Sequence, residues 1–331
     1  MAKTIKDERY LCASAYVRAL ESQLLSEADL SRMIDADSVE DALRILSDKG
    51  YPATAPSMVS LEENLRQDRE DVLQSVGDLI PDAAILDLFR LPYDYHNIKV
   101  ALKAVWTGQD ARRLLMGGGR LDPKKLYHII ETGEEAQLPH PLSSAIREAR
   151  ETMARTGDPQ RGDFILDRSC FAERRAIARG AGNPFLSQYV QLMTDITNLQ
   201  VLFRLLRMGK GFVILEEALF HGGSVGADEL LACAGSQDIV EVYRASRLED
   251  AAVVGVQAVT SGSLTTFEKA CDDTMTHFLQ QAILIPFGLE PVLAYLAARE
   301  QEQRNIRIII SGRLAGLAPD TIRERMREAY V

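Results

Sequence analysis

Hydrophobic residues recur at three- and four-residue intervals along most of the chain, and regular alternation of apolar and polar residues is rare. A period near 3.6 residues is typical of amphipathic helices that bury one face. Ser26 precedes an acid-rich turn, where a serine side chain can accept hydrogen bonds from free amides, so we expect a second helix to begin there. The other predicted helices cover residues 10–25, 39–47, 61–76, 83–106, 123–131, 141–155, 187–207, 228–234, 265–281, 290–311 and 320–329.

Strand signals are weak throughout the sequence. Two runs of β-branched residues, 253–259 and 306–310, lie inside helical patterns or beside turn residues, and the second run lacks polar alternation. We therefore predict an all-α fold that holds, at most, a stray short strand.

An internal repeat is the most informative feature of the sequence. Three predicted helices carry an acid three residues before an asparagine, followed by an aliphatic, a long polar residue and another aliphatic residue. The three words are Asp94-Tyr95-His96-Asn97-Ile98-Lys99-Val100, Asp195-Ile196-Thr197-Asn198-Leu199-Gln200-Val201 and Glu302-Gln303-Arg304-Asn305-Ile306-Arg307-Ile308. Their asparagines are 101 and 107 residues apart, which indicates a large repeated unit.

A second marker repeats out of phase with the first. The pairs Leu25-x4-Leu30, Leu121-x4-Leu126 and Val225-x4-Leu230 precede their asparagines by 72, 77 and 80 residues. Glycine-rich turns stand before the second and third pairs. Because the two markers keep the same order and nearly the same spacing, we interpret the chain as three helical modules, 10–120, 121–224 and 225–331. They form one repeat architecture rather than independent domains.

Composition and charge narrow the class of protein. The 331 residues include 38 Lys and Arg against 48 Asp and Glu, a net charge of -10. A general nucleic-acid binder needs a basic surface, so this balance argues against that class and favours partners with basic surfaces. No segment has the roughly 20 mostly apolar residues of a spanning helix, and the first eight residues lack the apolar core of a signal peptide. We expect a cytosolic or peripheral protein.

Candidate chemistry is sparse. Residues 222–226 match the G-x-S-x-G pattern of a serine hydrolase, but that motif needs a strand before the serine, and residues 215–220 have a helical pattern. A hydrolase that uses Ser224 stays an alternative, which a strand at this place would support. The five histidines lack the spacing of a metal site, and the four cysteines, without a C-x-x-C motif, are interpreted as small buried hydrophobic residues. We predict no catalytic residue, cofactor or bound metal.

The repeated acids and asparagines are the candidate site residues, and they have two interpretations. In the first, polar groups from related helices line a central cavity and meet a partner there. In the second, they are structural and hydrogen-bond across neighbouring helices within each module. The six residues are Asp94, Asn97, Asp195, Asn198, Glu302 and Asn305.

The repeated words, above all Leu91-Pro92-Tyr93-Asp94-Tyr95-His96-Asn97-Ile98-Lys99, resemble the C subunit of prokaryotic V/A-type ATPases, a family related to the eukaryotic V-ATPase d subunit. Similar words occur from about residue 10 to the C-terminus, at 16–21, 24–26, 198–199, 204–207, 302–307 and 312–317. The chain departs from the family pattern most over 138–162, where three prolines punctuate a charged segment.

This resemblance implies a funnel of three similar helical subdomains around a pseudo-threefold axis, with a central cavity. In that family the protein sits on the membrane rotor ring of ion-carrying subunits and receives the foot of the rotor shaft, the D and F subunits, in the cavity. It transmits rotation without binding nucleotide, as a peripheral protein on the cytoplasmic face of a membrane. We expect largely polar contacts inside the cavity. A generic α-solenoid adaptor is the other alternative, although such repeats span about 33 to 47 residues.

Overall fold

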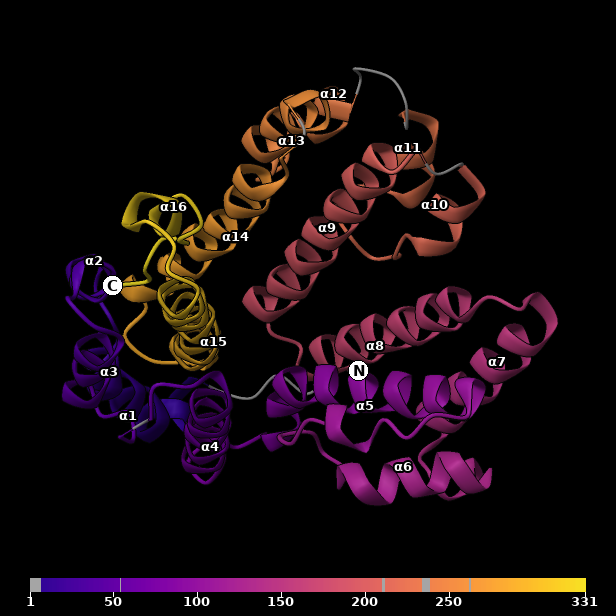
Figure 1. The fold of residues 1–331 in the computed structure, drawn as a ribbon, viewed down its shortest axis with the longest axis horizontal. Helices are drawn as coiled ribbons and strands as arrows, with labels where there is room; N and C mark the ends of the chain where they lie inside the picture. Colours follow the sequence, from indigo (N-terminus) through magenta and orange to yellow (C-terminus); the bar gives the residue numbers. More distant parts are fainter. Residues whose placement is uncertain (1–6, 54, 210–211, 234–238, 262) are drawn as a thin grey trace.

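The structure is a computed structural model that describes residues 7–53, 55–209, 212–233, 239–261 and 263–331. Every regular element within these ranges is a helix, so the predicted all-α fold is confirmed (Figure 1). The α-helices are α1 (Leu11–Glu21), α2 (Glu27–Asp35), α3 (Val39–Asp48), α4 (Met58–Gly77), α5 (Asp87–Thr107), α6 (Pro123–Thr132), α7 (His140–Thr156), α8 (Pro159–Ala181), α9 (Pro184–Arg207), α10 (Phe212–Ala218), α11 (Ala227–Cys233), α12 (Ile239–Tyr243), α13 (Glu249–Ser261), α14 (Thr265–Gln280), α15 (Leu289–Leu314) and α16 (Pro319–Arg323). Short 3-10 helices are η1 (Asp7–Tyr10), η2 (Ala83–Leu86), η3 (Arg112–Leu114), η4 (Glu135–Gln137) and η5 (Gln281–Leu284).

Local signals placed several helix starts correctly. Ser26 caps α2, where its hydroxyl accepts from the Asp29 N–H and the Asp29 carboxylate accepts from the Ser26 N–H. Such a reciprocal pair satisfies two amides that the first turn otherwise leaves free. Both β-branched runs are helical, one inside α13 and the other inside α15.

Two predictions of local structure need correction, and one helix was not predicted. The predicted helix over 141–155 is α7, but α8 was not predicted; Pro159 opens it after Asp158, whose side chain accepts from the Gln160 N–H. The predicted helix over 320–329 ends at Arg323, since the following backbone finds partners elsewhere; Gln280 donates to the carbonyls of Ala329 and Tyr330. Cys12 is exposed, whereas Cys170, Cys233 and Cys271 are buried as expected.

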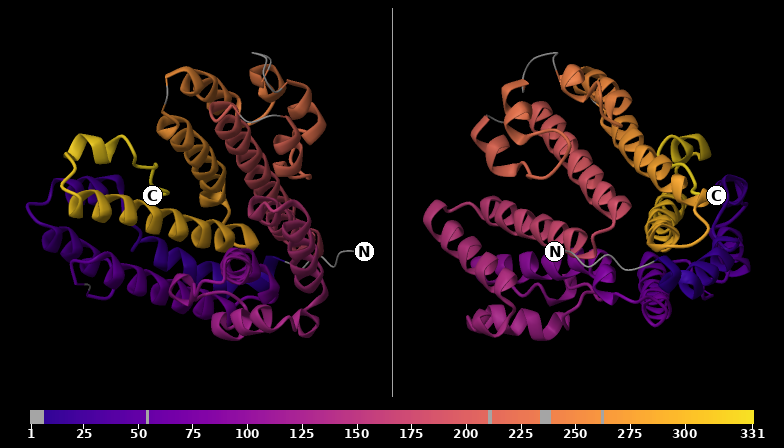
Figure 2. Two further views of the ribbon diagram at one scale, coloured as in Figure 1. Left: turned by 45° about the vertical axis from the view of Figure 1, so that its right-hand side comes forward. Right: turned by 180° about the vertical axis from the view of Figure 1, so that it is seen from behind.

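The helices pack in three groups around the long helices α5, α9 and α15. Helices α6, α7 and α8 pack with α5, helices α10 to α14 gather around α9, and α1 to α4 with α16 surround α15 (Figures 1 and 2). Each group includes one of the three repeated words, because those words lie on α5, α9 and α15.

The largest hydrophobic cluster joins the beginnings of the three long helices. It contains Leu88 and Phe89 of α5, Leu186 of α9, and residues 289 and 292–298 of α15. Further along, the first and last of these helices enter separate cores, one within α5–α8 and one among α2, α3, α4, α15 and α16. The long helices therefore share a core at their amino-terminal ends. The pseudo-threefold funnel and the three module boundaries stay predictions.

Candidate functional site

All six repeated polar residues are buried; Glu302 is the most exposed of them, at 7%. Each asparagine side chain forms two hydrogen bonds with the backbone of one residue, which lies 19 or 22 positions further along the chain. Its Nδ2 donates to that residue's carbonyl oxygen and its Oδ1 accepts from the same residue's N–H, at 2.8–3.0 Å. The pairs are Asn97 with Met116, Asn198 with Phe220, and Asn305 with Arg327. The asparagines thus hold the chain that returns past each long helix.

Two of the three acids, Asp94 and Asp195, bind a second stretch of backbone a few residues after the partner of their asparagine. Asp94 Oδ1 accepts from the N–H groups of Arg120 and Leu121 at 3.0 and 3.2 Å, and its Oδ2 accepts from Arg120 Nε at 2.7 Å. Leu121 is the first residue of the predicted second module. The carboxylate on α5 therefore holds the start of the next repeat.

Asp195 on α9 makes the corresponding contacts with the start of the predicted third module. Its Oδ2 accepts from the N–H and the hydroxyl of Ser224, at 2.9 and 2.7 Å, and its Oδ1 accepts from the Val225 N–H at 3.3 Å. The described residues before Ser224 form the helix α10 and a turn, with no strand among them. The hydrolase hypothesis required a strand before Ser224, and none is present there. The Ser224 hydroxyl is instead hydrogen-bonded to Asp195, so the structure does not support a nucleophilic role.

Glu302 on α15 connects the last repeat with the first. Its Oε2 accepts from the Leu25 N–H, and its Oε1 accepts from the Tyr51 hydroxyl and Arg299 Nη1 at 2.7 and 2.6 Å. Leu25 is the repeat counterpart of Leu121 and Val225 in the second sequence marker. Three equivalent acids therefore hold three equivalent backbone positions, and the last of these links closes the series.

Burial controls the ionisation of these acids. Removal from water raises the pKa of the Asp195 and Glu302 carboxyl groups above their ordinary values, although the hydrogen bonds they accept oppose that rise. These features are typical of structural polar contacts, as the second interpretation expects. The asparagines bond within their own predicted modules, whereas the acids bond to the start of another one.

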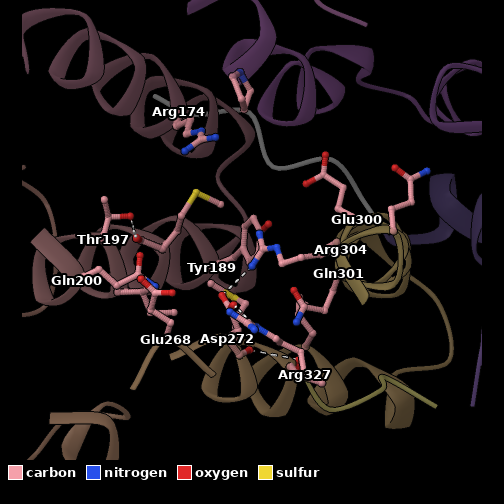
Figure 3. A pocket seen from close by; sticks show the side chains of 18 of the residues that line it. Arg174, Tyr189, Thr197, Gln200, Glu268, Asp272, Glu300, Gln301, Arg304 and Arg327 are labelled. Atoms are coloured by element: carbon pink, nitrogen blue, oxygen red, sulfur yellow. Dashed lines mark hydrogen bonds and ion pairs between the residues drawn. The ribbon is translucent and has the colours of Figure 1, made fainter. Parts of the chain in front are cut away.

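A cavity of about 700 Å³ lies between the long helices (Figure 3). It is lined by residues of α5, α8, α9, α14 and α15 and by Arg327 near the C-terminus, and none of the six repeated polar residues belongs to its lining. Their close neighbours in the sequence do: Tyr93, Thr197, Gln301 and Gln303 all face it. The repeat located the correct stretch of each helix, but neighbouring positions on a helix point to different sides.

A signal for the cavity residues was present in the sequence. Polar residues recur at three- and four-residue intervals on one side of two helices, as Thr197, Gln200 and Arg204 on α9 and Glu300, Arg304 and Arg307 on α15. A stripe with that period lies on a single helix face. The sequence alone left open whether that face meets bulk water or an enclosed space.

Arginine predominates among the charged groups of the cavity. Five arginines and three acids line it, an excess of two positive charges, in a chain whose net charge is -10. Several of these arginines have carboxylate partners: Arg204 contacts Glu268 at 2.7 Å, while Arg304 and Arg327 both contact Asp272 at 2.8 Å. The wall of the cavity therefore has the opposite sign to the molecule as a whole.

Two donors and one acid in the cavity have no such partner in the described part of the chain. Arg174 Nε and Gln301 Nε2 are buried and have no hydrogen-bond partner among the described residues. Glu300 forms no ion pair with any part of the chain that the structure describes, and its burial raises the pKa of its carboxyl group. In Figure 3, Arg174 projects from α8 on one side of the cavity, and Glu300, Gln301 and Arg304 project from α15 on the other.

Neither a membrane-spanning helix nor a metal-binding cluster occurs in the described ranges. Within those ranges no helix combines the length and the apolar character that crossing a membrane requires. No group of three or more His, Cys, Asp or Glu residues in the same ranges could hold a metal ion.

Comparisons with known proteins find, over almost the entire chain, the same family that the repeated words resemble. The family model for the ATP synthase (C/AC39) subunit matches residues 13–325. The C subunit of a V-type sodium ATPase from Enterococcus hirae is 27% identical over 95% of this chain and 97% of its own length. The C subunit of an A-type ATP synthase from Methanocaldococcus jannaschii is 22% identical, covering 95% and 85%, and that of a V-type ATP synthase from Thermus thermophilus is 23% identical, covering 95% and 97%.

Proposed function

The chain belongs to the ATP synthase (C/AC39) subunit family, and on that premise we propose that it is the non-catalytic central-stalk coupler of a rotary V/A-type ATPase. In this role it seats the rotor shaft, formed by the D and F subunits, on the membrane rotor ring. It passes rotation between the shaft and the ring, for ATP-driven ion transport or for ion-driven ATP synthesis. The proposed position is peripheral, on the cytoplasmic face of the membrane.

The cavity between the long helices is the observation that carries this proposal. It offers about 700 Å³ with a lining that is rich in Gln, Thr and charged side chains, as a replaceable polar contact with a shaft requires. The lining comes from five helices of all three helix groups, so a shaft held there would load every group at once.

The shared core supports a mechanical role. Side chains in protein interiors pack as densely as in organic crystals, and such interiors deform little under load. The first turns of α5, α9 and α15 are held in one such core, and buried acids connect each long helix to the next repeat. A torque applied in the cavity would therefore reach the whole molecule through stiff contacts.

Site-directed cross-linking tests the seat of the shaft. Cys12 is the exposed cysteine, so a Cys12→Ser background allows a single introduced thiol to carry a photoactivatable cross-linker. Gln200→Cys places it in the cavity, and in the assembled complex we expect adducts with the D or F subunit. The matched control is Gln160→Cys, an exposed position at the start of α8, which should give no shaft adduct.

The alternatives predict different results. If the chain is a generic adaptor, it will not copurify with the D and F subunits, and neither thiol will form a shaft adduct. Equal adducts from residues 200 and 160 would show contact that does not involve the cavity, and would contradict the proposed seat.

A further inference from the structure

We propose that the cavity receives an acidic helical turn of its partner, whose carboxylates bind the side of the cavity formed by Arg174. This inference rests on the proposed function and adds the chemistry of the segment that enters. The net charge of the chain suggests a partner with a basic surface, but at this one surface we expect an acidic partner.

The first support is the arrangement of charge. Arg204, Arg304 and Arg327 share the carboxylates of Glu268 and Asp272 inside the cavity. Arg307 contacts Glu62 of α4, outside the lining, at 2.8 Å. Arg174 has no carboxylate within ion-pair distance in the described part of the chain. It is the cation in the cavity whose charge is left for a partner.

The second support is the geometry of Arg174. Its guanidinium lies over the ring of Phe171, one turn earlier on α8, with its central carbon 5.1 Å from the ring centroid. Stacking on an aromatic ring orients a guanidinium and leaves its edge free for hydrogen bonds. Arginine binds carboxylates with a planar fork of donors, so an acid is the natural ligand for this position.

The third support is an imbalance of donors and acceptors. Arg174 Nε and Gln301 Nε2 lie on opposite sides of the cavity, and each is a buried donor without a partner among the described residues (Figure 3). A buried donor left without a partner has lost its water and gained no hydrogen bond in return. A partner that supplies oxygen acceptors, such as carboxylates or the free carbonyls at a helix end, provides that hydrogen bond.

Glu300 is the opposing group. Its carboxylate is in the lining and repels an acidic partner, and the arginines around it, Arg69, Arg174, Arg304 and Arg307, favour its charged form. Because Glu300 forms no direct ion pair in the described structure, removing its charge changes the field in the cavity without breaking a salt bridge.

The volume limits the size of the segment. A helix about 10 Å wide that rises 1.5 Å per residue fills roughly 120 Å³ per residue. A cavity of about 700 Å³ therefore corresponds to roughly one to two helical turns. The part of the partner that enters is, on this proposal, the end of a helix or a tight loop.

Paired charge variants of the full chain test the inference by their affinity for the purified complex of D and F subunits. Arg174→Glu should weaken binding on the order of tenfold or more, and Arg174→Lys should keep only part of the affinity, because lysine retains the charge but loses the stacked planar fork. Glu300→Gln should strengthen binding several-fold, a result that misfolding cannot produce. The control is Arg179→Glu, an exposed position on the same helix with the same charge change, which should leave affinity unchanged.

The outcomes separate the two proposals. If the wild-type chain does not bind the D and F subunits at all, the proposed function fails. If the wild-type chain binds but Arg174→Glu binds equally well or more tightly, or Glu300→Gln binds more weakly, the function stands and the acidic turn is wrong.

Discussion

The carboxylate of each repeated acid packs closely against the backbone turn that it binds. Two of the three turns make room for it with a glycine, and the third does not. A Cβ added to Gly119 would lie 2.3 Å from Asp94 Oδ1, and one added to Gly223 would lie 2.0 Å from Asp195 Oδ1. The third turn has Gln23 at the corresponding place, two residues before Leu25, and there the acid is glutamate. We infer that the extra methylene of Glu302 lets its carboxylate reach the backbone without a glycine.

Gly223→Ala tests the packing of this turn. The new methyl group would overlap the Asp195 carboxylate, whose hydrogen bonds to Ser224 and Val225 would have to lengthen. We expect the free energy of unfolding to fall by about 1–3 kcal/mol, the usual cost of overpacking. Urea denaturation of the purified chain measures it.

Gly180→Ala is the control for that substitution. Gly180 lies in α8, and a Cβ there would meet nothing within 4 Å. Alanine in a helix is roughly 0.5–1 kcal/mol more favourable than glycine, so this variant should be slightly more stable than the wild type. Equal effects at both glycines would mean that the carboxylate does not require the space beside Gly223.

At the scale of helices, the repeated acids are links between consecutive repeats. Asp94 and Asp195 bind backbone 26 to 30 residues further along the chain, whereas Glu302 binds the Leu25 N–H, 277 residues back. The first two links join segments that the chain already keeps close. The third holds the first and last parts of the chain together, so we expect its loss to disturb the tertiary structure more than the loss of either of the others.

Glu302→Gln tests that third link. A glutamine has one acceptor oxygen for the donors of Leu25, Tyr51 and Arg299, and its amide nitrogen faces another donor. We expect stability to fall by about 1–3 kcal/mol, the cost of leaving a buried group without a partner. Hydrogen exchange should rise in α2 and α3, which pack on α15 near this link, and should not change in α6 or α7.

The control is Glu148→Gln, which removes an exposed charge from α7. It should leave both the stability and the exchange pattern unchanged. A uniform rise in exchange across the whole chain for Glu302→Gln would contradict a local link.

The sequence was sufficient for most elements, because periodicity and caps such as Ser26 are local signals. It did not predict α8, a helix of 23 residues that Pro159 opens. The six polar residues were found by their repetition, but their role depends on which side of each helix is covered. That side is decided by packing between segments a hundred residues apart, which no local pattern contains.

At the scale of the molecule, the core shared by the beginnings of α5, α9 and α15 should control cooperativity. The core within α5–α8 is separate from it and contains no residue of the other two long helices. Regions that share buried contacts open together in hydrogen exchange, and regions that do not can open alone.

A matched pair of substitutions tests this difference. Leu186 of α9 is fully buried in the shared core, and Leu126 of α6 is 1% exposed in the separate one. Each change to alanine should cost about 2–5 kcal/mol where it acts. Leu186→Ala should raise exchange in α5, α9 and α15 together, whereas Leu126→Ala should raise it only in α5–α8. If Leu186→Ala affects α9–α14 alone, the long helices do not form one mechanical unit, and the cavity between them could not pass a load from one helix group to the next.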